Sequence, residues 1–355
     1  MRVLLIGPEW DTGLWTDYCG AGLEAGGHDV ATLFYGRDLA RPVGLWGRVR
    51  RRLAGPHRFH IGRVLEAMRR DNLRVLDAAV RHRPDLTVVL KGEVLLPETV
   101  ERLRDLTSGP VVQWCGDDPS WFPHIMAAAH LYDRFFLAEP SYAADLARHG
   151  VGAEFMTHAA DPDTWGPAPD ELQDPPEWDV VFVGDARHNM GHLPSTRLRV
   201  DLVEAAARSG LRVAVWGRGW EKLDANSPAR QRHEGLTLLP AAAVARAYRR
   251  AKIALNAHHA QMREGVNMRT FEIPAAGAFQ LCDAKARLGE LLEIGHEVAV
   301  YEGVDDLVDR LHRYAGDDAA RARIAEAGRR RVLRDHTYTV RMAQLVARSH
   351  GEPAA

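Results

Sequence analysis

Short apolar runs alternate with longer amphipathic stretches along most of the chain. In the first part of the sequence the apolar runs lie at 2–6, 28–33, 85–90, 111–115 and 134–138. Between the second and third runs, the apolar positions of 61–80 recur at the spacing of a helix. Strands that alternate with helices in this way predict βαβ units, and therefore a parallel sheet covered by helices on both faces.

A proline-rich stretch interrupts this alternation. Residues 161–178 contain five prolines, and neither helical nor strand periodicity continues through them. Beyond them we expect a helix at 195–207 and strands at 180–183, 212–216, 236–239, 253–255, 278–281 and 298–301. The pattern predicts an α/β protein of two doubly wound, Rossmann-like domains with a helical C-terminal tail. The expected parts are a first domain at 1–165, a linker at 166–178, a second domain at 179–335 and the tail at 336–355.

The composition is that of an ordinary globular protein, and it argues against several classes of function. The chain has 355 residues, of which 46% are apolar and 26% charged, enough for more than one domain. A net charge of −2 argues against non-specific nucleic-acid binding over the whole surface. Three cysteines without a CxxC spacing argue against a disulfide framework and a structural zinc site. Because no apolar stretch is long enough to span a membrane, we expect a cytoplasmic protein.

The segment 264–283, EGVNMRTFEIPAAGAFQLCD, carries the strongest local signal for a binding site. It lies between two expected strands, so a helix should begin near Asn267, a favoured N-cap residue, and end at Gly277. Arg269 and Glu272 then share one face of its first turns. A guanidinium beside a helix N-terminus suits a diphosphate, and a carboxylate can accept hydrogen bonds from both hydroxyls of a ribose. The alternative is that these two residues pair with each other on the surface.

The same segment resembles a known family. The pattern N-x-R-x-F-E-I-x-A-x-G-x-F-x-L at 267–281 is followed by GHEVAVY at 295–301, IAEAGRRRVLRDHTY at 324–338 and Arg341. In this order the motifs resemble those of the CgeB-type glycosyltransferases, which have the GT-B fold. The resemblance implies two Rossmann-like domains facing a cleft. It also implies sugar transfer from a nucleotide-sugar donor held mostly by the C-terminal domain, without a metal or other cofactor.

Within this resemblance Glu272 would hold the donor ribose, and Arg269 and Asn267 would lie by the diphosphate. One departure from the broader fold family is clear. Many retaining GT-B enzymes carry two glutamates seven residues apart, whereas Glu264 and Glu272 are eight apart in this sequence. The motif therefore does not predict whether the configuration of the transferred sugar is retained or inverted.

The sequence WGRGW at 216–220 follows an expected strand of the second domain. Gly217 has no side chain to prevent a ligand from approaching the backbone closely. Either Trp216 or Trp220, but not both, is expected to offer its ring to the base of the donor. The alternative is that both indoles pack in the core, which is the usual place of tryptophan.

Two other positions after strands are candidates for donor binding. The loop that begins at Gly184 leads to Arg187, and the likeness to GT-B transferases implies that this arginine meets the diphosphate. His258 is expected either to donate to the phosphate or sugar, or to be purely structural. A metal site at His258 and His259 is disfavoured, because adjacent side chains rarely converge and no third ligand is suitably spaced.

Carboxylates follow two strands of the first domain. Asp118 precedes Pro119 and fits the N-cap of a helix whose N1 residue is proline, which leaves its neighbour Asp117 available for chemistry. Sugar transfer needs a group that takes the proton of the acceptor, and we predict that Asp117 is this base. Glu93 is the competing carboxylate on the acceptor side, and Lys91 is a candidate for binding an acidic group.

Two further stretches of the first domain bear on the acceptor. The loop 7–15 lacks the GxGxxG and Walker patterns, and its Trp10, Asp11 and Trp15 are expected on the acceptor side. From Arg41 to Arg70 the chain has nine arginines against a single acidic residue. Apolar residues at helical spacing accompany them, so this stretch is a candidate for weak contact with an anionic membrane surface; a solvated lid is the alternative.

The expected function is metal-independent transfer of a sugar from a nucleotide-sugar donor to an unidentified small-molecule or glycan acceptor, with no specific nucleic acid as partner. A first alternative is a non-catalytic relative that binds the nucleotide sugar and acts as an assembly module. A second alternative is a peripheral membrane or nucleic-acid adaptor that acts through the arginine-rich stretch. The neutral net charge counts against this second alternative.

Overall fold

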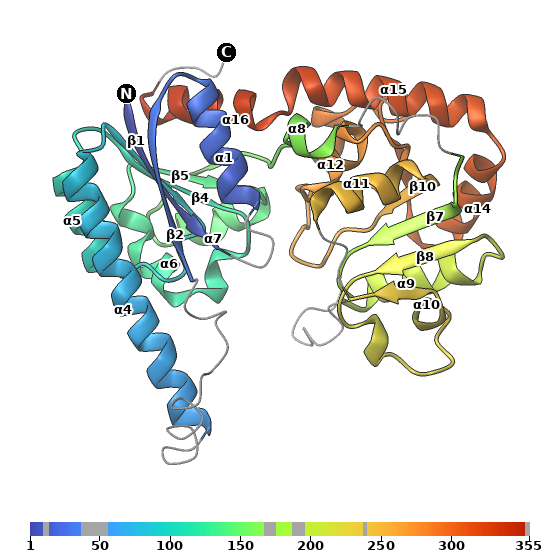
Figure 1. Ribbon diagram of the computed structural model, residues 1–355, viewed down its shortest axis with the longest axis horizontal. Helices are drawn as coiled ribbons and strands as arrows, with labels where there is room; N and C mark the ends of the chain where they lie inside the picture. The colour runs from blue at the N-terminus through green and yellow to red at the C-terminus, as the bar shows by residue number, and fades with distance from the viewer. Residues whose placement is uncertain (10–13, 37–55, 167–174, 187–195, 237–239, 352–355) are drawn as a thin grey trace. The chain divides into compact units, whose positions relative to one another are not determined.

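A computed structural model describes residues 1–9, 14–36, 56–166, 175–186, 196–236 and 240–351 (Figure 1). The chain divides into two compact units. The N-terminal unit contains Met1–Met156 together with Tyr338–Ala355, and the C-terminal unit contains Thr157–Thr337.

The N-terminal unit is built on a six-stranded, wholly parallel sheet of order β2-β1-β3-β4-β5-β6. Its strands are β1 (Arg2–Pro8), β2 (Asp29–Tyr35), β3 (Leu86–Leu90), β4 (Val111–Cys115), β5 (Arg134–Leu137) and β6 (Ala153–Phe155). Its helices are α1 (Leu14–Ala25), α4 (Pro56–His82), α5 (Pro97–Leu106), α6 (Pro123–Ala128), α7 (Ala143–Ala147) and α16 (Tyr338–Ser349). The central strands β3 and β4 are buried at every residue, as expected where helices cover both faces.

The C-terminal unit has a second parallel sheet of six strands, of order β12-β11-β10-β7-β8-β9. Its strands are β7 (Trp178–Val183), β8 (Val213–Trp216), β9 (His233–Gly235), β10 (Ala251–Asn256), β11 (Gln280–Asp283) and β12 (Ala299–Tyr301). Its helices are α8 (Pro162–Trp165), α9 (Thr196–Arg208), α10 (Pro228–Gln231), α11 (Ala241–Arg249), α12 (Arg269–Ala275), α13 (Leu288–Leu291), α14 (Gly303–Ala315) and α15 (Asp318–Asp335). This is the strand order of a Rossmann fold, and it reverses between β7 and β10.

The predicted α/β class and both parallel sheets are confirmed. One expected strand is displaced: β9 forms at His233–Gly235 rather than at 236–239, where Leu236 lies in a bend and 237–239 lie outside the described residues. The short strand β6 was not expected, because three residues are too few to show a period. Among the described helices, none has the length and apolar character needed to cross a membrane.

The C-terminal helix α16 is part of the N-terminal unit, where it packs against α1. The backbones approach closely at Gly22, since an added Cβ there would lie 2.6 Å from the carbonyl oxygen of Tyr338. The rings of Tyr18 and Tyr338 meet at the same contact, with centroids 5.3 Å apart. The residues expected to form a separate tail therefore help to close the core of the first unit.

We predict that Gly22→Ala destabilises the protein by about 1–3 kcal/mol, because the new methyl group forces α16 away from α1. The control is Gly62→Ala, in the helix α4, where an added Cβ meets nothing within 4 Å. This control should raise stability by up to about 1 kcal/mol through helix propensity. Urea unfolding of both variants gives the two values, and equal stability of the two would contradict the close α1–α16 contact.

Candidate functional site

The candidate donor site lies at the carboxyl ends of β7 and β10 in the C-terminal unit. Ligands of open parallel sheets bind outside these ends, where the strand order reverses. The chain leaves β7 at Gly184 and β10 at Asn256, and the segment after β10 leads into α12. The carboxyl end of β11 contributes Asp283 beside them.

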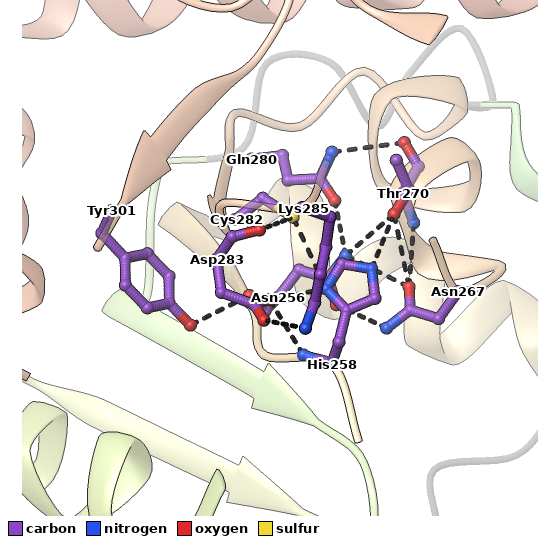
Figure 2. A network of polar contacts seen from close by, with 9 residues as sticks. All are labelled: Asn256, His258, Asn267, Thr270, Gln280, Cys282, Asp283, Lys285 and Tyr301. Atoms are coloured by element: carbon purple, nitrogen blue, oxygen red, sulfur yellow. Dashed lines mark hydrogen bonds and ion pairs between the residues drawn. The ribbon is translucent and has the colours of Figure 1, made fainter. Parts of the chain in front are cut away.

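Asn256 holds this end of the sheet together (Figure 2). Its side chain is fully buried, and its amide nitrogen donates to Asn267 Oδ1 at 3.2 Å and to Gln280 Oε1 at 3.0 Å. The amide of Asn267 donates back to Asn256 Oδ1 at 2.9 Å. Tyr301 Oη donates to the carbonyl oxygen of Asn256 at 3.2 Å. One side chain and its backbone thus connect the strands β10, β11 and β12 with the loop before α12.

Asn267 performs part of the predicted capping. The helix α12 begins at Arg269 rather than at Asn267, and Met268 is its N-cap residue. The side-chain oxygen of Asn267 nevertheless accepts from the backbone N–H of Thr270 at 3.2 Å, and so satisfies a donor of the first turn. At the other end, Gly277 follows the helix with φ +78°, as predicted for a C′ glycine.

His258 is a structural member of the same network. Its side chain is fully buried, Nδ1 lies 2.6 Å from Asp283 Oδ1, and Nε2 lies 3.4 Å from Thr270 Oγ1. Burial lowers the pKa of His258, so the neutral ring donates from Nδ1 to the carboxylate. Lys285 Nζ lies 3.3 Å from the other oxygen of Asp283. Of the two roles considered for His258, this packing supports the structural one.

A group of three residues offers atoms that metals bind. The side chains of His258, Cys282 and Asp283 place one ligand atom each within 4.8 Å of one another. The imidazole and the carboxylate are already hydrogen-bonded to each other, and the Lys285 ammonium also contacts Asp283. Burial raises the pKa of the Cys282 thiol, which favours the uncharged form that binds metals poorly. The negative charge of Asp283 is therefore balanced by the Lys285 ammonium and the His258 hydrogen bond.

Arg269 lies beside Gly184. Its Nε donates to the carbonyl oxygen of Val183 at 2.7 Å, which fixes the guanidinium at the end of β7. A Cβ added to Gly184 would lie 3.7 Å from Arg269 Nη2, so the glycine backbone and the guanidinium share one small region. No ion pair joins Arg269 and Glu272 among the described residues, so the alternative of a surface pair is not the arrangement seen.

Glu272 is a buried carboxylate that lacks a hydrogen-bond donor. The residue is 8% exposed, and no N–H or O–H of the described residues donates to its side chain; its oxygens are not among the described atoms that are fully buried without a partner, so they keep some contact with solvent. Burial raises the pKa of Glu272 to about 7, although Arg269 opposes the shift. A buried carboxylate without donors costs free energy. A ligand that brings two hydroxyl groups would supply the missing hydrogen bonds.

The loop after β8 requires glycine at position 217. Gly217 has φ +141°, and an added Cβ would lie 2.2 Å from the carbonyl oxygen of Gly184. Trp220 Nε1 donates to that same carbonyl at 2.7 Å, and its ring is fully buried against Phe182. Trp216 is 8% exposed and packs edge-to-face on Trp178. Both indoles therefore pack in the unit, and neither face of Trp220 is open to a ligand.

Three of the predicted site residues, Arg187, Trp10 and Asp11, lie outside the described residues. Trp15 lies in the first turn of α1 in the N-terminal unit, half-buried, with its ring edge-to-face on Trp114 at 5.2 Å. This contact joins α1 to β4. It places Trp15 beside the strand that leads to Asp117.

The predicted acceptor-side residues Lys91, Glu93 and Asp117 come together in the N-terminal unit. Lys91 Nζ lies 2.9 Å from Asp117 Oδ2, 3.7 Å from Glu93 Oε1 and 4.7 Å above the ring of Phe122. Burial works to lower the pKa of Lys91, but the two carboxylates outweigh it and raise the pKa, so the ammonium stays charged. Lys91 has φ +62°, a left-handed conformation that is uncommon outside glycine and tends to occur at functional sites.

The two carboxylates of this cluster differ in accessibility. The side chain of Asp117 is 31% exposed, whereas that of Glu93 is 11% exposed and accepts from Tyr35 Oη at 2.6 Å. Burial raises the pKa of Glu93. Asp118 caps the short turn 119–121 by accepting from the Ser120 N–H at 2.9 Å, as predicted. Asp117 is therefore the carboxylate that a substrate reaches most easily.

Sequence reasoning missed several residues that complete these sites. In the C-terminal unit they are Asn256, Thr270, Gln280, Asp283 and Lys285, and in the N-terminal unit Tyr35. One sequence signal could have found Asn256: it is a polar residue at the end of an apolar strand, in KIALN. A buried amide at such a position needs hydrogen-bond partners. The partners themselves are distant in sequence and are not identifiable by spacing.

Comparisons with known proteins agree with this architecture. Residues 197–347 match the model of a family described as glycosyl transferase-like. A sucrose-phosphate synthase from Thermosynechococcus elongatus superposes with a TM-score of 0.67 at 13% identity, covering 99% of each chain. Anabaena Alr3699/HepE in complex with UDP-glucose gives 0.64 at 12% identity, again over 99% of each chain. AviGT4, a glycosyltransferase involved in avilamycin A biosynthesis, gives 0.59 at 15% identity over 98% of this chain and 97% of AviGT4. The search of curated proteins found no match.

These likenesses extend over both units and show the fold, which is the GT-B fold of glycosyltransferases. The family match begins in α9 and ends in α16, so it includes β8, β10, α12 and β11. It therefore covers Arg269 and Glu272.

We predict that Glu272→Gln makes the ligand-free protein more stable above neutral pH. The folded pKa of about 7 exceeds the ordinary value of 4.5, so the stability from this group is present at low pH and is lost as pH rises through about 7. Glutamine cannot ionise, so the variant should gain up to about 3 kcal/mol at about pH 8 and much less at about pH 5.

Thermal unfolding across this pH range measures the effect. Glu101→Gln, which removes an exposed carboxylate in α5, is the control and should change stability little at either pH. A wild-type protein as stable as Glu272→Gln at high pH would contradict an unsatisfied buried carboxylate.

Proposed function

We propose that this protein is a glycosyltransferase that moves a sugar from a nucleotide-sugar donor to an acceptor hydroxyl, without a bound metal. The observation that carries the proposal is the buried carboxylate of Glu272, held without hydrogen-bond donors at the carboxyl end of a Rossmann-type sheet. The glycosyl transferase-like family match over the same residues supports it. The motif order at 267–341 supports a place near the CgeB-type enzymes.

In this proposal the C-terminal unit binds the donor. The ionised Glu272 accepts from the two ribose hydroxyls, and the guanidinium of Arg269 faces the diphosphate. Gly184 and Gly217 let the loops after β7 and β8 approach each other closely and are proposed to bring backbone groups to the phosphates, with Asn267 supporting the first turn of α12. Arg187 is proposed as a second cation for the diphosphate. A positive side chain beside the diphosphate stabilises the leaving group as negative charge develops on it, which is the work a metal does elsewhere.

The N-terminal unit carries the proposed base. Asp117 takes the proton of the acceptor hydroxyl, and the oxygen forms a bond to the anomeric carbon of the sugar. The bond from that carbon to the phosphate oxygen breaks, and the nucleoside diphosphate leaves with its electrons. Lys91, 2.9 Å from Asp117, holds the carboxylate in place. Trp15 and Glu93 are proposed to border the acceptor, and Trp216 rather than the fully buried Trp220 is proposed to lie near the base of the donor.

Ligands bound by structural neighbours guide the choice of donors to test. HepE has been crystallised with UDP-glucose, with UDP, and with UDP and glucose. Another neighbour, the T4 phage protein BGT, was crystallised with UDP and Mn²⁺, with a TM-score of 0.57 at 11% identity. These ligands belong to those proteins, and they make uridine diphosphate sugars the first donors to test. Binding should be measured with and without Mn²⁺ to test the proposed metal independence.

We predict that calorimetry detects binding of at least one UDP-, GDP- or dTDP-sugar, and that Glu272→Gln weakens it by at least about tenfold, since hydrogen bonds to a charged group are lost. Chelator should leave the affinity unchanged. The control is Glu101→Gln, which should bind like the wild type. Failure of every common nucleotide sugar to bind would exclude the proposed function.

Asp117→Asn separates catalysis from binding. If Asp117 is the base, the variant should bind the donor normally but transfer sugar about 10²–10⁴-fold more slowly. The transfer rate is measured as consumption of the donor in the presence of a panel of simple hydroxyl acceptors. A wild-type protein that binds donor tightly but consumes none with or without acceptor would favour the non-catalytic binding module.

A further inference from the structure

The long helix α4 of the N-terminal unit carries an exposed apolar stripe. Leu65, Leu73 and Val80 are 61%, 58% and 55% exposed. They are the three most exposed large apolar side chains among the residues that the structure describes. A single exposed large apolar side chain is common on protein surfaces. Three on one helix indicate a surface that contacts another molecule or a membrane.

The three side chains share one face of the helix. At 100° per residue they fall within an arc of about 80°, and they extend over about 22 Å of helix length. Exposed Arg69 lies within the same arc. The buried face, with Val75 and Ala79, packs on a different side against β1, β2 and α5. Leu76 falls within the same arc but is partly buried against the core, so the stripe lies along the margin of the side of α4 that builds the core.

The surroundings of this stripe are strongly basic in sequence. The sequence from Arg41 to Arg70 contains nine arginines and a single acid, Glu66, which pairs with Arg70 at 3.5 Å; residues 41–55 of it lie outside the described residues. In the described part of α4, Arg69 is exposed within the stripe, whereas Arg74 pairs with Asp71 and Arg81 with Asp77. Figure 1 shows the first turns of α4 extending beyond the end of the sheet that the helix covers. The basic sequence leads directly into this projecting end.

Charge and apolar surface together select the partner. Nucleic acid offers phosphates to the arginines but no apolar phase for two leucines and a valine. An anionic lipid surface offers both, because arginine side chains reach the headgroups while the apolar side chains enter the acyl boundary. The structure thus provides one narrow apolar stripe flanked by cationic sequence, which is the pattern of a helix lying in the plane of a membrane surface.

We propose that the stripe Leu65–Leu73–Val80 of α4 docks the N-terminal unit reversibly on an anionic lipid bilayer. Three apolar side chains and a basic neighbouring sequence suffice for reversible binding and not for permanent anchoring. The proposal does not depend on the glycosyltransferase activity proposed above.

The test is co-sedimentation of the full-length protein with vesicles of phosphatidylcholine alone and of phosphatidylcholine mixed with phosphatidylglycerol, at about 0.15 M salt. The wild type should bind the anionic vesicles and not the neutral ones. The triple variant Leu65→Gln, Leu73→Gln, Val80→Gln should bind at least about tenfold more weakly. The matched control is Leu198→Gln with Ile294→Gln, which removes two side chains, each 48% exposed, from the C-terminal unit and should leave binding unchanged.

Three results would overturn the proposal. One is absence of binding to anionic vesicles by the wild type, and another is equal binding by the wild type and the triple variant. The third is a wild-type dimer, seen by light scattering, that the triple variant abolishes, because the stripe would then be covered by a second copy of the chain. Thermal unfolding followed by circular dichroism serves as the folding check, since the triple variant should unfold cooperatively and with the helix content of the wild type.

Discussion

The amide pair of Asn256 and Asn267 is the interaction on which the geometry of the C-terminal unit depends. A buried amide must find partners for its donors and its acceptor, and Asn256 finds them on two separate segments, the loop before α12 and the strand β11. This requirement fixes where β10 ends, how the loop approaches α12 and how β11 lies beside it. The helix α12 has only seven residues and would be marginal in isolation. Its position comes from this network and from the Arg269 hydrogen bond to β7.

Glu272 differs from the residues of this network in having no hydrogen bond from the described protein. The network around Asn256 and His258 is closed, with donors and acceptors matched inside the protein. The Glu272 carboxylate, five residues after Asn267, is nearly buried, and burial raises its pKa. A group held in this way at a functional site can be stabilised by a ligand that donates hydrogen bonds to it. The contrast distinguishes side chains that build the site from the one that we propose binds the donor.

The sequence predicted the fold well because parallel strands buried on both faces are continuous apolar runs, and those at 111–115 and 180–183 were placed within two residues. It also placed Lys91 and Asp117 just after strands, and Arg269 and Glu272 in the helix that follows β10, where the structure has them. It did not reveal that Trp220 is buried, since a tryptophan in a core and one in a binding loop have the same local sequence. Nor did it reveal the His258–Asp283 pair, whose partners are 25 residues apart and meet only because β10 and β11 are neighbours.

The central claim is that donor binding ionises Glu272 by supplying its missing hydrogen bonds. Calorimetric titration with a nucleotide sugar at about pH 7, in two buffers with different heats of ionisation, measures the protons released. With a free pKa of about 7, binding should release about half a proton from the wild-type protein. Tight binding with a heat that is independent of the buffer would contradict the claim.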